Sequence, residues 1–303
     1  MAETLRTDAL ERNPDLVVAA VYEREVGASL ERVWENVYDW EHLPWLHAQA
    51  FESIEPIATG EWGWHARVGL PGNTRAEIEL VTDRDARHYV ARTLEGAGAP
   101  SEIWTSLEPV EDDRTAIRVE FCVRPLPAEA LARVGEVYVS LYTVLWDQDE
   151  SMMQTRETAL AERRVRSTAS VSEAAGVGTA DEADAVALGP ADALRASLPI
   201  VVEMGGHRFR ILEHEGELIA HSTQCPHLLG PLDACPPEDG VLVCPWHGYR
   251  FDPKTGRSVD GRRLRLRPAP RIVVDAATGE ASARFERDTG TGAQATPSAR
   301  GAG

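Results

Sequence analysis

The sequence predicts an α+β fold with two domains: an N-terminal domain in which a curved antiparallel sheet packs against a long helix, and a C-terminal all-β domain. Two observations lead to this prediction. A first strand, a broken helix and six further strand-like runs come before a long amphipathic helix. Later in the chain, two Cys and His boxes lie among short strand-like runs. A length of 303 residues also suits two domains.

The N-terminal domain is expected after a flexible arm at residues 1–15. It begins with a strand at 16–26, and Ser29 then caps a helix that is disturbed near Pro44. Turn residues separate six strand-like runs, at 51–58, 61–69, 74–82, 87–95, 102–110 and 114–124.

A helix expected at 128–165 completes this domain, which we place at 16–166. Its apolar residues recur at a spacing of three and four, which is typical of a helix that faces a core. Trp62, Trp64, Tyr89 and Trp104 fall on the predicted strands, and we interpret them as core residues rather than substrate contacts.

The second half of the chain divides by composition. Residues 167–190 are predicted to form a linker, because the run from 170 to 190 has four acids, no Lys or Arg and no aromatic residue. The all-β domain is expected at 191–287, with strands near 200–204, 208–213, 217–222 and 240–244. A tail at 288–303 has no Val, Leu, Ile or aromatic residue and is expected to be disordered.

Charge and composition exclude several classes of partner. The formal net charge of −18 argues against nucleic acid and anionic membranes. No apolar run approaches the length of a membrane span, and the first residues lack the pattern of a signal peptide. Four Cys in 303 residues do not form a disulfide scaffold. We therefore expect a cytoplasmic protein.

The central motif consists of two boxes, Cys225-Pro-His227 and Cys244-Pro-Trp-His247. Two thiolates and two imidazoles suit a Rieske centre, in which two His replace two Cys on one iron of a [2Fe–2S] cluster. The boxes resemble those of the Rieske ferredoxin-like family, so the resemblance implies that these four residues bind a [2Fe–2S] cluster. A structural zinc site is the alternative, although zinc sites usually have CxxC and HxxxH spacing.

The surroundings of the boxes indicate a low reduction potential. High-potential Rieske proteins carry Ser and Tyr two and four residues after the second His, where this chain has Tyr249 and Phe251. Cys235 lies between the boxes, but the second box offers no Cys to pair with it. Hydrogen bonds to the cluster sulfurs set the potential, so we expect a centre of the oxygenase or ferredoxin type.

A second candidate site lies in the first domain, where Asn36, Asp39, His42 and His47 are spaced as N-x2-D-x2-H-x4-H. Two His and one carboxylate can hold iron(II) and leave one face open for oxygen. Residues five apart project about 140° from each other on a regular helix. The helix must therefore break between the two His, and Pro44 supplies a reason for the break.

The third ligand is expected on the long helix. Asp149 lies on its apolar stripe, where an unpaired carboxylate would be costly, and Asp147 points about 160° away and is the weaker choice. This pattern resembles the mononuclear iron motif of Rieske non-haem iron oxygenases. The resemblance implies that Asp39 bridges a Rieske His to an iron-ligand His across a subunit boundary. It also implies that Asn36 lies near the iron.

The order of elements in the first domain resembles the START-like, helix-grip superfamily, in which a curved sheet wraps a C-terminal helix. Together the resemblances imply a terminal oxygenase with iron(II) as cofactor and O2 as co-substrate. They also imply an apolar organic substrate and a homo-oligomer, for which a trimer is favoured. Electrons from NAD(P)H would arrive through a separate reductase or ferredoxin, since no GxGxxG motif is present. The order of the two domains is reversed relative to that family.

Two rival interpretations remain open. The first domain could be a ligand-binding or cyclase-like helix-grip domain without catalytic iron, fused to a Rieske electron carrier. Alternatively, the chain could be a ferredoxin whose first domain only docks a partner. The iron content per chain distinguishes these interpretations from the oxygenase.

Overall fold

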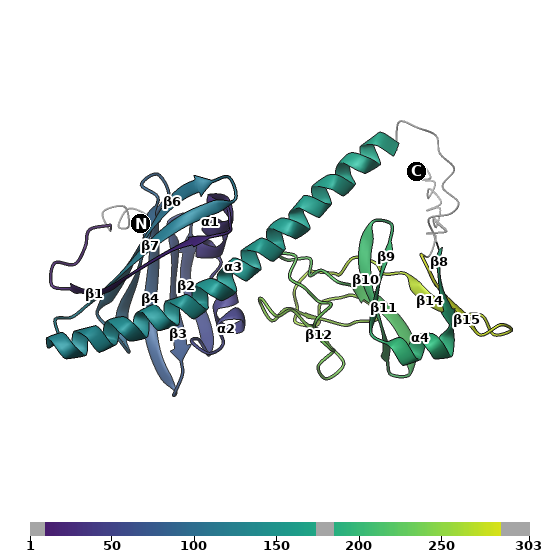
Figure 1. Cartoon of the computed structure of the whole chain (residues 1–303). Helices are drawn as coiled ribbons and strands as arrows, with labels where there is room; N and C mark the ends of the chain where they lie inside the picture. Colours follow the sequence, from purple (N-terminus) through teal and green to yellow (C-terminus); the bar gives the residue numbers. More distant parts are fainter. Residues whose placement is uncertain (1–9, 174–184, 286–303) are drawn as a thin grey trace, which may run out of the picture.

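The computed structural model describes residues 10–173 and 185–285, and these form two domains joined by one long helix (Figure 1). The N-terminal domain is a seven-stranded antiparallel sheet in the order β1-β7-β6-β5-β4-β3-β2. This confirms the predicted sheet. Its strands are β1 (Val17–Val26), β2 (Ser53–Gly60), β3 (Gly63–Leu70), β4 (Thr74–Asp83), β5 (His88–Gly96), β6 (Ser101–Glu111) and β7 (Arg114–Val123).

The long helix α3 (Ala128–Glu173) crosses one face of this sheet and continues toward the second domain (Figure 1). It approaches β1 closely, since a Cβ added at Gly135 would lie 2.6 Å from the carbonyl oxygen of Ala19. Trp146 and Met153 of α3 share a buried core with sheet residues such as Trp64. The helix was expected to end at residue 165, but it continues to Glu173.

The segment that carries the two His is broken into short pieces. Helix α1 (Leu30–Tyr38) begins after Ser29, whose Oγ accepts a hydrogen bond from the backbone N–H of Arg32 at 3.3 Å. It ends at Asp39, where φ −84° and ψ 82° leave the helical region. The chain then forms η1 (Trp40–His42) and α2 (Leu43–Leu46). The break thus comes at Asp39, before Pro44. Pro44 lies in the first turn of α2, where a backbone N–H would have no partner within the helix, so proline is tolerated there.

The C-terminal domain contains three small antiparallel sheets and one short helix, which confirms the predicted all-β domain. The sequence predicted strands near 200–204, 208–213, 217–222 and 240–244, but it did not predict the strands at 185–190, 250–251, 271–274 and 280–284 or the helix at 191–197. The sheets are β9 (Ile200–Met204) with β10 (His207–His214) and β11 (Glu217–Ser222), β12 (Leu242–Val243) with β13 (Arg250–Phe251), and β8 (Ala185–Pro190) with β14 (Arg271–Val274) and β15 (Glu280–Arg284); the helix is α4 (Ala191–Ser197).

Helix and strand take up both ends of the linker predicted at 167–190. Residues 167–173 continue α3, and β8 pairs with β15. Val186 and Leu188 of β8 pack against the buried core around Phe209, which a reading of composition alone did not reveal. Residues 10–15 of the predicted arm form no helix or strand. The rest of that arm, residues 174–184 and the tail predicted at 288–303 lie outside the described residues.

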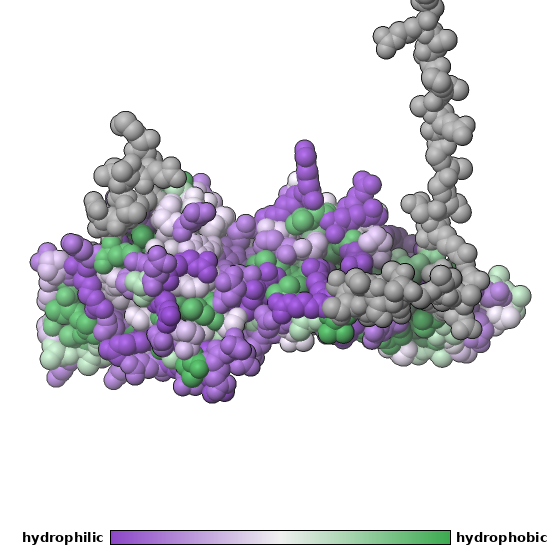
Figure 2. Space-filling model, turned by 90° about the horizontal axis from the view of Figure 1, so that it is seen from above, coloured by the Kyte–Doolittle hydropathy of each residue, from purple (hydrophilic) through white to green (hydrophobic). Residues whose placement is uncertain are grey.

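The two domains share a buried core. Met152 of α3 belongs to the same buried cluster as Cys225, Cys244 and Leu266 of the C-terminal domain, and Leu46 of α2 packs against that cluster. Polar and apolar residues are mixed over the face shown in Figure 2, with polar residues covering much of the N-terminal domain. Among the residues that are described, no helix combines the length and apolar character that membrane crossing requires.

Candidate metal centres

The first centre is formed by two tight loops of the C-terminal domain. Cys225 and His227 follow β11, whereas Cys244 and His247 follow β12. Backbone hydrogen bonds of 2.9 Å close each loop, from Cys225 N to the carbonyl of Gly230 and from Cys244 N to that of Tyr249. The loops also lie against each other, because a Cβ at Gly230 would be 2.8 Å from Cys244 Sγ.

The donor atoms of these loops fit a Rieske cluster. Both Cys are 1% exposed, and the Nδ1 atoms of His227 and His247 are buried without a hydrogen-bond partner among the described residues. The two imidazole rings are 4.6 Å apart between centroids. The hydrogen bond from Cys225 lowers the pKa of Cys244, which favours the thiolate form of Cys244. Two sulfurs and two unpartnered Nδ1 atoms match the ligands of a [2Fe–2S] centre.

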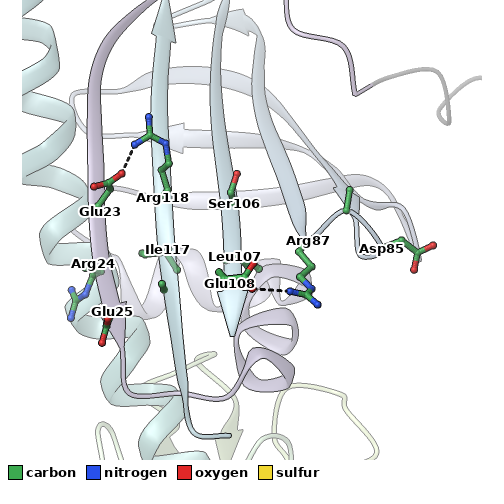
Figure 3. Close-up of a pocket in the computed structure, with 12 residues that line it drawn as sticks. Glu23, Arg24, Glu25, Asp85, Arg87, Ser106, Leu107, Glu108, Ile117 and Arg118 are labelled. Carbon is green, nitrogen blue, oxygen red and sulfur yellow. Dashed lines mark hydrogen bonds and ion pairs between the residues drawn. The ribbon is translucent and has the colours of Figure 1, made fainter. Parts of the chain in front are cut away.

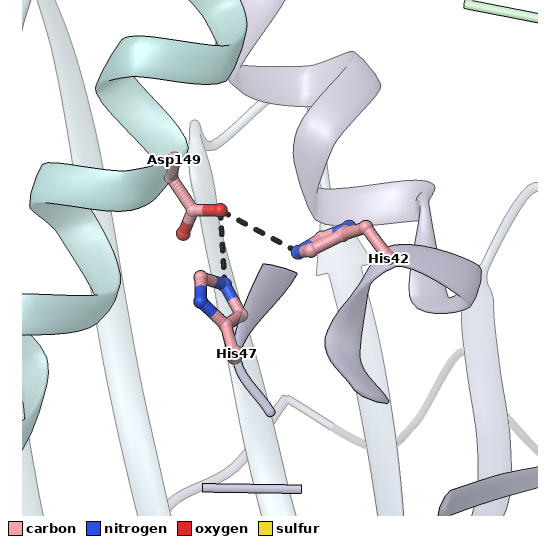
Figure 4. A group of neighbouring side chains, drawn as sticks. All are labelled: His42, His47 and Asp149. Carbon is pink, nitrogen blue, oxygen red and sulfur yellow. Dashed lines mark hydrogen bonds and ion pairs between the residues drawn. The ribbon is translucent and has the colours of Figure 1, made fainter. Parts of the chain in front are cut away.

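The second centre brings together His42, His47 and Asp149, which the sequence predicted as iron ligands (Figure 4). One ligand atom of each lies within 4.8 Å of the others. His47 Nε2 is 3.1 Å and His42 Nε2 is 3.4 Å from Asp149 Oδ1. All three side chains are buried. Two imidazole nitrogens and one carboxylate on the wall of a cavity are a donor set that suits iron(II).

Two neighbouring amides orient these ligands. Asn36 Nδ2 donates a hydrogen bond to Asp149 Oδ1 at 3.0 Å, and His47 Nδ1 lies 2.8 Å from Gln148 Oε1. Burial opposes ionisation of Asp149, but the hydrogen bond from His47 and the charge of His42 bring its pKa below the usual range. The sequence indicated Asn36 and missed Gln148, because Gln148 resembles any polar residue on a helix. Its position directly before Asp149 was the only available signal.

Asp147, the weaker candidate for the third ligand, is not part of this site. Its side chain is 62% exposed, and its carboxylate forms an ion pair with Arg24 at 2.7 Å. The two acids are two residues apart on α3, so they point to different sides of the helix. The structure therefore places only Asp149 beside the two His.

Asp39 joins the two centres. Its Oδ2 atom is 2.7 Å from His247 Nε2 and 3.6 Å from His42 Nδ1. Burial works against the charged pair. The hydrogen bonds nevertheless raise the pKa of His247 to about 9 and hold the pKa of Asp39 well below its usual range. Because the Nε2 of His247 faces Asp39, its Nδ1 is left for the cluster.

This bridge forms within one chain, where the sequence led us to expect a contact between subunits. The reason lies in the shared core, which docks the cluster loops of the C-terminal domain directly onto α2 and α3. A second contact supports the same interface, since Arg156 of α3 donates a hydrogen bond to the carbonyl of Leu228 at 3.2 Å and also pairs with Glu35 of α1 at 2.7 Å.

Tyr249 supports the other cluster histidine. Its ring stacks on His227 with centroids 4.5 Å apart, and its hydroxyl donates a hydrogen bond to Glu41 of η1 at 2.9 Å. The guanidinium of Arg262 lies over the Tyr249 ring, 3.9 Å from its centroid. In the sequence, Tyr249 was notable only because it stands where high-potential Rieske proteins have Ser.

The ligands His42, His47 and Asp149 open into an internal cavity of about 270 Å³ between the sheet and α3. Apart from the metal ligands, mainly apolar and aromatic side chains line it, including Trp64, Tyr89, Leu141, Tyr142, Leu145 and Trp146. Trp64 and Tyr89 thus belong to both the core and the cavity wall. Trp62 and Trp104 pack in a separate cluster, which agrees with their interpretation as core residues.

A further hollow lies on the sheet, at strands β1, β6 and β7 and the turn between β4 and β5 (Figure 3). Charged pairs line it, such as Glu23 with Arg118 and Arg87 with Glu108. Four of its charged side chains are paired in this way, and it offers no group of metal-ligating side chains among the described residues.

Comparisons with known proteins agree with the first centre. Residues 184–269 match the family of the Rieske [2Fe–2S] domain. The chain is 30% identical over 71 residues to the ferredoxin component of the alkene monooxygenase system of Xanthobacter autotrophicus (strain ATCC BAA-1158 / Py2). That match covers 23% of this chain and 58% of the relative, so the chain spans less than two thirds of that protein's length.

Similar solved structures correspond to less than half of the chain. Norcoclaurine synthase from Thalictrum flavum is 22% identical, and the match covers 46% of this chain and 91% of that one with a TM-score of 0.36. A START superfamily protein from Mycobacterium smegmatis is 20% identical over 44% of this chain and 97% of that one, with a TM-score of 0.36. The Zhui aromatase/cyclase from Streptomyces sp. R1128 is 15% identical over 45% and 93%, with a TM-score of 0.38.

The chain therefore carries a Rieske [2Fe–2S] domain, preceded by a domain in which a seven-stranded antiparallel sheet packs against a long helix.

Proposed function

We propose that this protein is the terminal oxygenase of a Rieske system, with the two domains in reversed order. One observation carries the proposal: Asp39 contacts His247 of the cluster loops at 2.7 Å and lies 3.6 Å from His42 of the three-residue ligand set. A carboxylate between two imidazoles fixes the orientation of both rings and provides a short path between the two centres.

Each residue has a definite task in this scheme. Cys225, Cys244 and the Nδ1 atoms of His227 and His247 would hold the [2Fe–2S] cluster. His42, His47 and Asp149 would hold iron(II), which when bound activates O2 for hydroxylation, dihydroxylation or oxidative demethylation of a substrate.

The remaining groups position the iron ligands and receive the substrate. Asn36 and Gln148 keep Asp149 and His47 in place through hydrogen bonds of 3.0 and 2.8 Å. The cavity beside Asp149 is mostly apolar and aromatic, so it favours a small apolar or aromatic molecule.

The alternative is a Rieske electron carrier fused to a helix-grip domain that binds a ligand without catalytic iron. The similarity of the C-terminal domain to a ferredoxin component favours this second function. In that case Asp149 would serve as a buried ion-pair partner of His47 and His42, and the same cavity would bind a ligand that undergoes no oxidation.

Iron content per chain tests the proposal. The oxygenase should hold about three iron atoms per chain, whereas a carrier should hold about two. His42→Ala, His47→Ala and Asp149→Ala should each remove the third iron and leave the absorption spectrum of the cluster unchanged. The matched control is His65→Ala, because His65 pairs with Glu77 outside the site at 2.9 Å and should have no effect on iron. Two irons in the unaltered chain, or oxygen-dependent turnover in the Asp149 variant, would refute the oxygenase.

A further inference from the structure

The protein is strongly acidic, but one segment beside the cluster loops has the opposite charge. Residues 250–271 contain eight Arg or Lys, two Asp and no Glu, which gives a net charge of +6 in a chain of −18. All eight cations are exposed. They are Arg250, Lys254, Arg257, Arg262, Arg263, Arg265, Arg267 and Arg271, and we call the surface that they form the cationic face.

The alternation of side chains connects the cationic face to the cluster. Leu266 is buried in the same cluster as Cys225 and Cys244, and Leu264 packs against it. The arginines that alternate with these leucines, at 263, 265 and 267, are exposed. Successive side chains of an extended segment point to opposite sides, so the cationic face lies one layer of side chains outside the core that surrounds the cluster cysteines.

The charge of this face is not cancelled by its own acids. Asp260 pairs with Arg262 at 2.7 Å, and Asp252 accepts hydrogen bonds from backbone N–H groups of a turn. Acids outside the segment pair with Lys254, at 2.9 Å from Glu217 and 3.0 Å from Glu215, and Glu41 lies 3.8 Å from Arg262. No carboxylate in the described part of the chain pairs with Arg257, Arg263 or Arg267. Arg257 and Arg265 also lie opposite each other in an antiparallel bridge, which concentrates positive charge.

The shape of the surface is also suitable for a partner. A groove of about 940 Å³ runs beside this segment, and Lys254, Arg265, Arg267 and Arg271 are among the residues that line it. By contrast, the N-terminal domain covers His247, which is 3% exposed. A donor therefore has no direct access to the cluster through that histidine.

We propose that the cationic face is the docking surface for an acidic one-electron donor protein. In the transfer step the donor is oxidised by one electron and the cluster is reduced by one electron, and no bond or proton changes place. Opposite charges on the two surfaces would speed encounter and orient the donor toward the core around Cys225 and Cys244. The inference depends on the [2Fe–2S] cluster and is independent of the mononuclear iron.

The test uses the full chain with its cluster and a reduced plant-type [2Fe–2S] ferredoxin as an acidic probe. The test variant carries Arg263→Glu, Arg265→Glu and Arg267→Glu. The control carries Arg67→Glu, Arg75→Glu and Arg133→Glu, which change the net charge equally on the N-terminal domain, where all three residues are exposed. Calorimetric titration gives the Kd, and stopped-flow absorbance gives the rate of cluster reduction.

At low salt the test variant should bind the ferredoxin at least about 10-fold more weakly and accept its electron at least about 10-fold more slowly, while the control stays within about twofold. High salt should remove the difference between the variants by screening. Reduction by the methyl viologen radical cation should not slow in either variant, which shows that the cluster is intact.

Equal losses in both variants would mean that only net charge matters, and would overturn the assignment. So would an unchanged Kd in the test variant, or equally tight binding of a DNA oligonucleotide by the unaltered chain. All of these outcomes are independent of iron at His42, His47 and Asp149, so they do not bear on the proposed oxygenase activity.

Discussion

Replacing Gly248 by Ala should disturb both metal centres through a single methyl group. Gly248 follows the cluster ligand His247 and has φ +64°, in the left-handed region that favours glycine. A Cβ at this position would lie 2.0 Å from two ring atoms of Trp45. Trp45 belongs to α2, the short helix between His42 and His47. The methyl group therefore pushes from the cluster loop onto the segment that carries His42 and His47, two of the proposed iron ligands.

The size of the effect has two parts. Placing an L side chain in the left-handed region costs about 1–2 kcal/mol. Moving Trp45 out of the way adds about 1–3 kcal/mol, as overpacking does elsewhere. The ring is 49% exposed, so it can swing outward rather than unfold the domain. We expect Gly248→Ala to lower the free energy of unfolding by about 2–5 kcal/mol and to reduce the content of the proposed third iron.

Two further variants separate the two parts of this effect. Gly216→Ala has the same kind of backbone, with φ +80°, but open space around the added Cβ, so it should show the strain alone. Combining Gly248→Ala with Trp45→Ala should remove the clash. The double variant should then lose about 1–2 kcal/mol less free energy of unfolding than the sum of the losses in the two single variants. Urea unfolding and iron analysis provide the measurements. Additive losses in the double variant, or equal losses in the Gly216 and Gly248 variants, would refute the reasoning.

Three other predictions concern side chains that support the centres. Asp39→Asn should keep all metal ions but slow reoxidation of the reduced cluster by O2 about 10- to 100-fold, measured by stopped-flow absorbance. Gln148→Leu should weaken iron binding about 10-fold or more through loss of the 2.8 Å contact to His47, measured by chelator competition. Burial raises the pKa of Glu35, but hydrogen bonds from Arg156 and Arg32 lower it by more, so the net pKa lies below its usual value. With solvent screening, this pairing should contribute about 0.5–1 kcal/mol above pH 4.5, and this stability should be lost as the pH falls below that value. Glu35→Gln should abolish that slope in unfolding measured against pH.

Much of the fold could be predicted because its signals are local. Strand alternation, turn residues and the apolar stripe of α3 each repeat over short distances, so the seven strands were found to within two residues. Strand β8 was missed because its partner β15 lies far away in the sequence, whereas β14 and β15 form a local hairpin of short, partly exposed strands with little apolar pattern. The end of α3 was missed because the residues after 165 are polar, as a helix between two domains can be.

The ligands of both centres could also be proposed from the sequence, because chemistry restricts them to Cys, His and acids at particular spacings. The spacing of residues within a motif does not predict which residues of the two domains contact each other. The contacts from Tyr249 to Glu41 and from Arg156 to Leu228 join residues about 70 to 210 positions apart, and neither pair has a motif. For the same reason the bridge through Asp39 was expected between subunits, although it forms within one chain.

Helix α3 explains how reversed domain order can still bring the centres together. Asp149, Met152 and Arg156 follow one another at intervals of three and four residues, so they lie on one face of the helix. Asp149 faces His42 and His47, Met152 enters the core around the cluster cysteines, and Arg156 holds the loop next to His227. One helical face therefore sets the positions of both centres, whichever domain comes first in the sequence. Helix α3 spans both domains and so helps to keep Asp39 between His247 and His42 within one chain.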